Sequence, residues 1–362
     1  MTKRAALVLS GGKASRFQAH SQYWQDKALA QLEAKPLLVH VVENVKDIVD
    51  EVIVCVNSWE RKEIYRDVLE QHGLNVKLVI DEKTEISGPN VAILTGLKAA
   101  QADQYLVVPC DMPFVKPQVA NYLFTLADGF DVVVPMWPNG RLETLIMILQ
   151  RTFGLEIVET LCKLKRPRSD DIPRAASKTL LASPMKTIKT LDPTFKSFTN
   201  INAQEDIKKL QTRRLQGPVQ DHVQLIQGVL SVSDLQLIRK AAKMRQEGNF
   251  KVAEETFDLC KNRFEFGSRF FWAGVAGEGK GETLLEHSQQ LKGVEPELSL
   301  KRDFEGKEAF FVAANSYRVE AEIYEKKRCL LLMHRALEDK SWCESWVMGK
   351  SLQQRWHKLK TA

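Results

Sequence analysis

The chain has 362 residues, more than one average domain needs, so its length favours two domains. Hydrophobic residues make up 44% of it and charged residues 27%, which excludes an intrinsically disordered chain. The net charge of +6 is mild and suits an anionic small molecule, such as a polyphosphate, at least as well as a nucleic acid, which would favour a concentrated basic stripe. We therefore expect a globular protein with a small-molecule ligand and no nucleic acid partner.

The cysteines and the apolar runs bear on where the protein works. Its six cysteines are scattered without any C-x-x-C pair, so neither a zinc site nor a disulfide scaffold is indicated. No apolar run approaches the roughly 18 residues of a membrane span, and the N-terminus leads directly into a short apolar strand. We expect a soluble protein of the reducing cytoplasm, without a membrane partner.

In the first two hundred residues, short apolar runs alternate with segments of helical period. The predicted strands are Ala5–Leu9, Glu51–Val56, Val76–Ile80, Tyr105–Pro109 and Asp131–Pro135. Apolar residues recur at three- and four-residue spacings, as in amphipathic helices, in Pro36–Val45, Arg61–His72, Val91–Ala100 and Gln118–Leu126. This alternation predicts an α/β, Rossmann-like domain whose mostly parallel sheet is covered on both faces by helices. Ligands bind at the carboxyl ends of the strands in such sheets.

The pattern changes near residue 220. A stretch of mixed charge, Gly and Pro at Gln211–Gln220 is typical of a linker. A Ser/Asp cap at Ser233 then begins a helical stretch, and Gly248 and Asn249 divide it into two helices, as in an α-hairpin of the tetratricopeptide kind. The segment Val312–Trp346 has a similar helical pattern. We predict a nucleotide-binding domain over residues 1–215 and an all-α, helical-repeat-like domain over residues 228–362. The second domain either binds a partner protein, self-associates or only stabilises the chain.

The segment GVAGEGKGET, residues 274–283, has some features of a phosphate-binding loop. Gly281, however, occupies the position that needs Ser or Thr, and no strand precedes the segment. We interpret it as a flexible connection between helices.

The first strand runs into two adjacent glycines, Gly11 and Gly12, with cations on the far side. Glycines let the backbone turn sharply and approach a ligand, and successive N–H groups in such a turn form a concave anion site. The turn has neither the Walker A spacing nor the G-x-G-x-x-G fingerprint. The alternative is a tight strand-to-helix turn without a ligand.

Ordered motifs along the first 210 residues or so show a resemblance to the MobA-like nucleotidyltransferases, which transfer an NMP from an NTP to a phosphorylated acceptor. The motifs are LSGGKASR from Leu9, DKALAQLEAKPLL from Asp26, VNSW around Asn57, VIDEKTEISGP around Asp81, GPNVAILTGL from Gly88, VVPCDMPFV around Asp111 and FTNINAQEDIKKL from Phe198. Within that family, CDMP together with NIN is most similar to the molybdenum cofactor guanylyltransferases.

Asp111 follows an apolar strand of five residues, and Pro113 stops the chain just beyond it. Its carboxylate should project from the carboxyl edge of the sheet, where Mg²⁺ takes oxygen ligands and phosphate oxygens. The alternative is that it caps the next helix. Arg16 and Lys27 would neutralise the β- and γ-phosphates and the departing pyrophosphate, unless they are solvated surface cations.

The resemblance implies further contacts. The nucleotide would lie over Leu9, Ser10, Gly11 and Gly12, with Asn57 and Asp81 at its base or sugar and Asn200 and Asn202 at the acceptor or at a metal-bound water. Asn57 could instead cap the helix starting near Glu60, Asp81 could sit in a turn, and Asn202 could cap a helix from Ala203.

Two segments and one further residue are candidates for contact with the substrates. The nine residues Phe17–Gln25, which carry Tyr23 and Trp24, form a longer loop than the family has, and are either a lid over the substrates or a surface insertion. Glu143 is a candidate for acceptor contact. The basic stretch Lys163–Asp171 meets the acceptor's phosphate or is a solvated loop.

Together, these features predict GMP transfer from GTP to molybdenum-loaded molybdopterin, with Mg²⁺ on Asp111 and pyrophosphate as the leaving group. No protein nucleophile is needed, since the acceptor's phosphate monoester is already anionic. The rivals are the same chemistry on another acceptor, namely cytidylyl transfer to molybdopterin, guanylyl transfer to phospholactate or cobinamide phosphate, or sugar-phosphate activation. A protein that binds the nucleotide or cofactor and delivers it to an apoenzyme is the alternative from another class.

Overall fold

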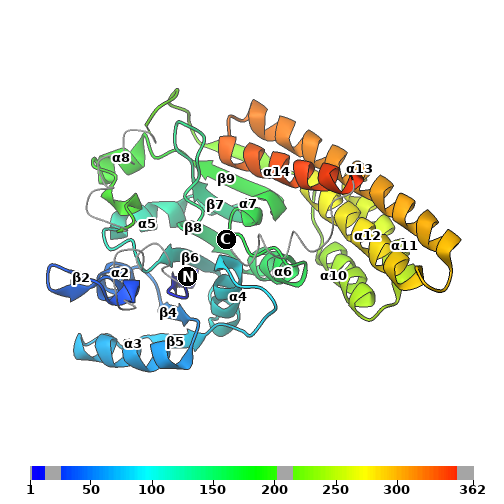
Figure 1. The fold of residues 1–362 in the computed structure, drawn as a ribbon. Coiled ribbons are helices and arrows are strands. Elements are labelled where there is room, and N and C mark those ends of the chain that lie inside the picture. The colour runs from blue at the N-terminus through cyan, green and yellow to red at the C-terminus, as the bar shows by residue number, and fades with distance from the viewer. Residues whose placement is uncertain (1, 13–25, 202–214, 349–362) are drawn as a thin grey trace. The chain divides into compact units, whose positions relative to one another are not determined.

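The computed structural model describes residues 2–12, 26–201 and 215–348. The chain divides into two compact units, Met1–Ile226 and Gln227–Ala362 (Figure 1). The first unit is an α/β structure built on one large sheet, and the second is all helical. The two fold classes predicted from the sequence are confirmed.

The sheet of the first unit has eight strands in the order β10-β9-β7-β8-β6-β1-β4-β5. The strands are β1 (Arg4–Leu9), β4 (Glu51–Val56), β5 (Lys77–Ile80), β6 (Gln104–Pro109), β7 (Val132–Pro135), β8 (Met147–Gln150), β9 (Lys178–Ala182) and β10 (Val223–Ile226). Neighbouring strands in the run β5-β4-β1-β6 are parallel, and so are β7 and β9. The strand β8 is antiparallel to both its neighbours, β6 and β7, and β10 is antiparallel to β9. The sheet is therefore mostly parallel, and its exceptions lie on the side beyond β6.

Helices cover both faces of this sheet because its strands are apolar on both sides. Ala6 and Val8 of β1 belong to a core that includes α2 (Leu37–Lys46), α3 (Trp59–Gln71) and α5 (Pro117–Thr125). Successive side chains of a strand point to opposite faces, so Leu7 faces away from that core. There it meets α4 (Pro89–Ala99), whose Gly96 lies so close that a Cβ would be 2.8 Å from Leu7 Cδ2.

A few further elements are described in the first unit. They are η1 (Lys27–Leu29), the hairpin β2 (Gln31–Leu32) and β3 (Lys35–Pro36), α6 (Arg151–Lys163), α7 (Asp171–Ala175), α8 (Thr187–Leu191) and η2 (Lys196–Phe198). The helix α6 packs beside α4.

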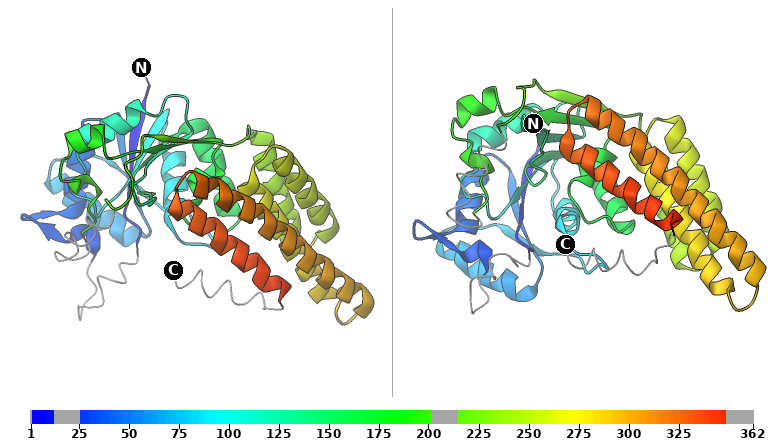
Figure 2. Two further views of the ribbon diagram at one scale, coloured as in Figure 1. Left: turned by 90° about the horizontal axis from the view of Figure 1, so that it is seen from above. Right: turned by 45° about the horizontal axis from the view of Figure 1, so that its top comes forward.

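The second unit is a stack of helices in which each packs against the next along the chain (Figure 2). Within the described residues these are α10 (Val232–Gln246), α11 (Phe250–Phe266), α12 (Phe270–Leu291), α13 (Pro296–Lys326) and α14 (Leu330–Val347). The N-cap of α10 is Ser231 rather than Ser233, and Asp234 completes a capping box with it. The predicted break at Gly248 and Asn249 is confirmed. Within the described ranges, no helix is both long enough and apolar enough to cross a bilayer.

The expectation of a flexible connection at residues 274–283 is wrong, because this segment lies inside the 22-residue helix α12 and is largely buried. Its glycines lie where neighbouring helices come close. A Cβ would be 2.6 Å from the Tyr317 ring at Gly274, 2.9 Å from Ala313 Cβ at Gly277, 2.4 Å from the Phe257 ring at Gly279 and 2.7 Å from the Phe310 ring at Gly281. The glycines therefore make room for α11 and α13 and do not supply flexibility.

Replacing Gly279 by Ala should destabilise the helical unit by about 1–3 kcal/mol, even though Ala favours helices, because the new methyl group would overlap the buried Phe257 ring. The control is Gly293→Ala in the exposed turn after α12, where a Cβ would have no neighbour within 4 Å among the described residues. Thermal unfolding followed by circular dichroism compares the two variants. Equal midpoints would contradict the packing role.

Candidate functional site

The register of the parallel strands brings their polar carboxyl ends together. Leu9, at the end of β1, is paired with Cys55 of β4 and with Pro109 of β6. Beyond the strands, Ser10 N–H donates to the Cys55 carbonyl over 2.9 Å and Cys110 N–H donates to the Leu9 carbonyl over 3.0 Å. The Gly-Gly turn, Asn57, Asp81 and Asp111 consequently lie along one edge of the sheet.

The first glycine of the turn is required by the closeness of its neighbours. A Cβ at Gly11 would lie 2.9 Å from Asp81 Oδ2 and 3.5 Å from Asn57 Cβ, whereas one at Gly12 would meet no atom of the described residues within 4 Å. Gly11 thus packs against two of the predicted ligand-binding residues.

Asn57 does not cap the following helix, so that alternative is wrong. The N-cap of α3 is Ser58, whose hydroxyl accepts a hydrogen bond from Arg61 N–H. The amide of Asn57 faces the turn instead, where its Nδ2 donates to the Gly11 carbonyl over 2.8 Å.

Asp81 follows β5 directly, and its N–H donates to the Val56 carbonyl over 2.7 Å. Burial raises the pKa of its carboxyl to about 7. Its Oδ1 is buried and has no hydrogen-bond partner within the described chain. This oxygen is therefore available to a ligand that donates a hydrogen bond.

Lys27 and Asp111 form an ion pair of 2.5 Å between Nζ and Oδ2, with each side chain 16% exposed. Lys27 is therefore not a solvated surface cation, and Asp111 does not cap the next helix, because α5 has Lys116 as its N-cap. Asp111 Oδ1 is buried and without a hydrogen-bond partner in the described chain.

The chain returns to Asp111 near the end of the first unit. Ile201 N–H donates to the Asp111 carbonyl over 2.9 Å, which brings Asn200 to the same place. Asn200 Oδ1 is also buried and unpartnered among the described residues. Arg16, Asn202 and the segment Phe17–Gln25 lie outside the described residues.

The oxygen atoms at Asp111 and Asn200 are of the type that a magnesium ion takes. The described chain has no group of three or more His, Cys, Asp or Glu that could hold a metal. Mg²⁺ does not require one, since it commonly binds one or two carboxylates together with waters and substrate phosphates. The two orphaned oxygens fit such a partial set of ligands.

Arg61 is the residue of this site that the sequence analysis missed. It is 7% exposed, although it lies one helical turn after Asn57 on a helix whose outer face is polar. Its Nε forms an ion pair of 2.9 Å with Asp26 Oδ2. The available signal was its spacing, because Arg61, Tyr65 and Leu69 form the buried stripe of α3.

The other side of the edge, beyond β6, holds the remaining candidates. Glu143 accepts a hydrogen bond of 2.5 Å from the indole Nε1 of the buried Trp137. The stretch Lys163–Asp171 is only partly a solvated loop, since Lys163 and Arg168 are exposed but Arg166 is buried. The Asn90 amide ties this stretch to α4 by donating to the Arg166 and Arg168 carbonyls.

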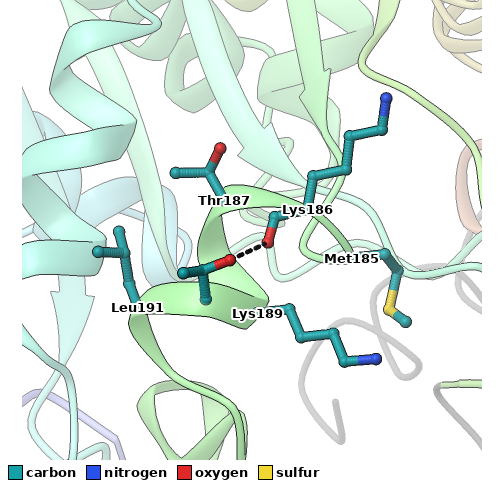
Figure 3. Close-up of a pocket in the computed structure, with 6 residues that line it drawn as sticks. Met185, Lys186, Thr187, Lys189 and Leu191 are labelled. Carbon is teal, nitrogen blue, oxygen red and sulfur yellow. Dashed lines mark hydrogen bonds between the residues drawn. The ribbon is translucent and has the colours of Figure 1, made fainter.

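A hollow of about 650 Å³ lies at α8, after the carboxyl end of β9 (Figure 3). Its lining residues are Met185, Lys186, Thr187, Lys189, Thr190 and Leu191. Lys186 forms an ion pair with Asp221. The hollow lies outside the cluster formed by Gly11, Asp81 and Asp111 and was not predicted from the sequence.

The chain is similar to a known family and to curated members of it. Residues 6–172 match the family described as MobA-like NTP transferase domain. A probable molybdenum cofactor guanylyltransferase of Methanosarcina acetivorans is 32% identical over 210 residues, which are 57% of this chain and 89% of that protein. One from Methanosarcina mazei is 30% identical over 207 residues, with the same two shares.

Among solved structures, the molybdopterin-guanine dinucleotide biosynthesis protein A of Archaeoglobus fulgidus is similar to this chain. The two are 20% identical with a TM-score of 0.47, over 58% of this chain and 97% of the other.

Replacing Asp81 by Asn should change the pH dependence of stability. Because burial raises the pKa of this carboxyl from 3.8 to about 7, Asp81 stabilises the fold below pH 3.8, and that contribution is lost as the pH rises to about 7. Asn does not titrate, so the variant should gain stability relative to the natural protein between about pH 5 and about pH 8. Urea unfolding at both pH values measures this, with the exposed Asp67→Asn on α3 as the control. A stability difference that is the same at both pH values would contradict the buried carboxylate.

Proposed function

This chain belongs to the MobA-like NTP transferase family and is a nucleotidyltransferase, and we propose that it transfers GMP from GTP to molybdenum-loaded molybdopterin with release of pyrophosphate. The names of the two Methanosarcina relatives support this choice of substrates. The observation that carries it is the partly buried Lys27–Asp111 pair, which lies at the same sheet edge as the Gly-Gly turn and leaves Asp111 Oδ1 unpartnered within the described chain.

In this proposal Asp111 Oδ1 and Asn200 Oδ1 would hold a magnesium ion, which would supply positive charge to the phosphates of GTP. Lys27 fixes Asp111 through its other oxygen, so the free oxygen keeps one orientation. The ammonium of Lys27 also places a positive charge beside the phosphates and the leaving pyrophosphate.

Asp81 favours guanine among the four bases. The Watson–Crick edge of guanine presents two adjacent donors, N1–H and the exocyclic amine, and a carboxylate accepts from both. Adenine lacks this pair of donors and is not matched by a group that only accepts. The unpartnered Asp81 Oδ1 supplies the first of these contacts, and Oδ2, beside Gly11, supplies the second.

The acceptor lies on the β6 side of the edge in this proposal, near Asn200 and Glu143. Its phosphate monoester attacks the α-phosphorus of GTP in line with the departing pyrophosphate. The monoester already carries negative charge near neutral pH, so the protein's residues position and neutralise, and none of them attacks the phosphorus.

Pyrophosphate release is the measurement that tests the substrates. The purified protein with Mg²⁺ is given each of the four NTPs, with and without molybdenum-loaded molybdopterin. We expect release with GTP that depends on the pterin. Release with another NTP, or only with another phosphorylated acceptor, would replace the substrate. Nucleotide retention without release from any mixture would favour a binding protein over an enzyme.

Replacing Asp111 by Asn should lower turnover by on the order of 100-fold or more, because the carboxylate that holds the metal is lost. Pyrophosphate release as a function of Mg²⁺ concentration is the measurement. Asp128→Asn, in the exposed turn before β7, removes the same charge from the opposite edge of the sheet and is the control. Unchanged turnover in Asp111→Asn would remove Asp111 from the metal site.

A further inference from the structure

Arg61 carries a charge that is almost wholly buried, and the molecule surrounds it with acceptors. A guanidinium only donates hydrogen bonds, and its burial is costly unless those donors are matched. Its Nη1 donates to Asn57 Oδ1 over 3.0 Å, to the Gly12 carbonyl over 3.2 Å and to the Ser10 carbonyl over 3.4 Å. Its Nε pairs with Asp26, so one side chain contacts both sides of the turn and the start of η1.

These contacts determine which way the Asn57 amide points. Because Arg61 offers only donors, the oxygen of the amide must face it, and Nδ2 then donates to the Gly11 carbonyl. A flipped amide would place donor against donor and acceptor against acceptor at once. Asn57 is therefore left with one N–H and one lone pair in fixed places for a ligand.

The same contacts orient the Gly-Gly turn. The carbonyls of Ser10 and Gly12 are held by Arg61, and that of Gly11 is held by Asn57. With the three carbonyl oxygens engaged by the protein, they are kept from facing an anionic ligand. The N–H groups of Gly11 and Gly12 have no partner within the described chain and remain for phosphate or sugar oxygens.

Arg61 also connects this half of the site to the phosphate half. Asp26, its ion-pair partner, accepts hydrogen bonds from the Tyr65 hydroxyl and from Ala28 N–H. The next residue is Lys27, which pairs with Asp111. Movement of Arg61 would therefore reach both Asn57 and the start of the segment that carries Lys27.

From these contacts we infer that Arg61 is a positioning residue that sets the base discrimination of the nucleotide site, by fixing the Asn57 amide and the Gly-Gly turn. The inference rests on the proposed nucleotide site and extends it to a residue that does not itself contact the nucleotide. It requires NTP binding and does not depend on which acceptor receives the nucleotide.

The test compares Arg61→Ala and Arg61→Lys with Arg66→Ala, which removes a partly exposed arginine paired with Glu63 on the same helix. Binding of GTP, ATP, CTP and UTP is measured for each variant, together with kcat and KM. In Arg61→Ala, binding of the preferred NTP should weaken on the order of 10- to 100-fold, and its preference over the other NTPs should fall towards one. Turnover at saturation should change less than KM.

Millimolar guanidinium should restore to Arg61→Ala part of its preference among the four NTPs, while Arg66→Ala should behave as the natural protein.

Arg61→Lys tests whether the guanidinium must bind on two sides at once. The single ammonium nitrogen of lysine pairs with Asp26 but does not also span the distance to Asn57. It should bind NTPs better than Arg61→Ala and still discriminate poorly. An equal loss of affinity for all four NTPs, with the preference intact, would show a purely structural role and overturn the inference. Should Arg61→Ala not fold, natural discrimination in Arg61→Lys would overturn it. A natural protein that binds an NTP but fails to transfer GMP to the pterin would defeat the proposed function alone.

Discussion

The buried ion pair between Arg61 and Asp26 is the interaction on which the proposed nucleotide site depends. Taking both charges out of water is expensive, and their attraction offsets that cost only when hydrogen bonds satisfy the remaining donors and acceptors. Here Tyr65 supplies one of these bonds to Asp26, and the turn at residues 10–12 accepts others from Arg61. With these hydrogen bonds, the pair thus joins three segments that are distant along the chain, namely the turn at residues 10–12, the start of η1 at Asp26 and the first turn of α3 at Arg61.

The sheet supplies the frame for this network and divides the site in two. β1 lies at the middle of four parallel strands, with β4 and β5 on one side and β6 on the other. Asn57 and Asp81 follow the strands of the first side, and Asp111 follows β6. The Gly-Gly turn, at the end of β1, borders both. In the proposed function, a nucleotide laid over that turn would have its base towards Asp81 and its phosphates towards Asp111, and the side beyond β6 would be left to a second substrate.

The sequence predicted the strands β1, β4, β5, β6 and β7 well, because strands buried on both faces are continuous apolar runs and stand out between amphipathic helices. It also located the polar residues at the strand ends, whose position follows from chain order. The strands β9 and β10 were not predicted, since their pairing at the far side of the sheet is a tertiary choice. Arg61 was missed for another reason. A charged side chain normally faces water, and its inward direction depends on Asp26, a residue 35 positions away.

For the glycines too, the sequence shows where the residue is but not what it packs against. Gly11 lies against the oxygen of Asp81, and Gly279 lies against the ring of Phe257, so both are needed for closeness. Gly11 brings the backbone close to polar side chains at the candidate ligand site. Gly279 brings two helices together in a packed core, where no ligand fits. Spacing alone made residues 274–283 look like a loop, because a glycine-rich string is equally compatible with flexibility and with tight packing. The neighbour that a glycine faces decides between a site and a core, and that neighbour is set by the fold.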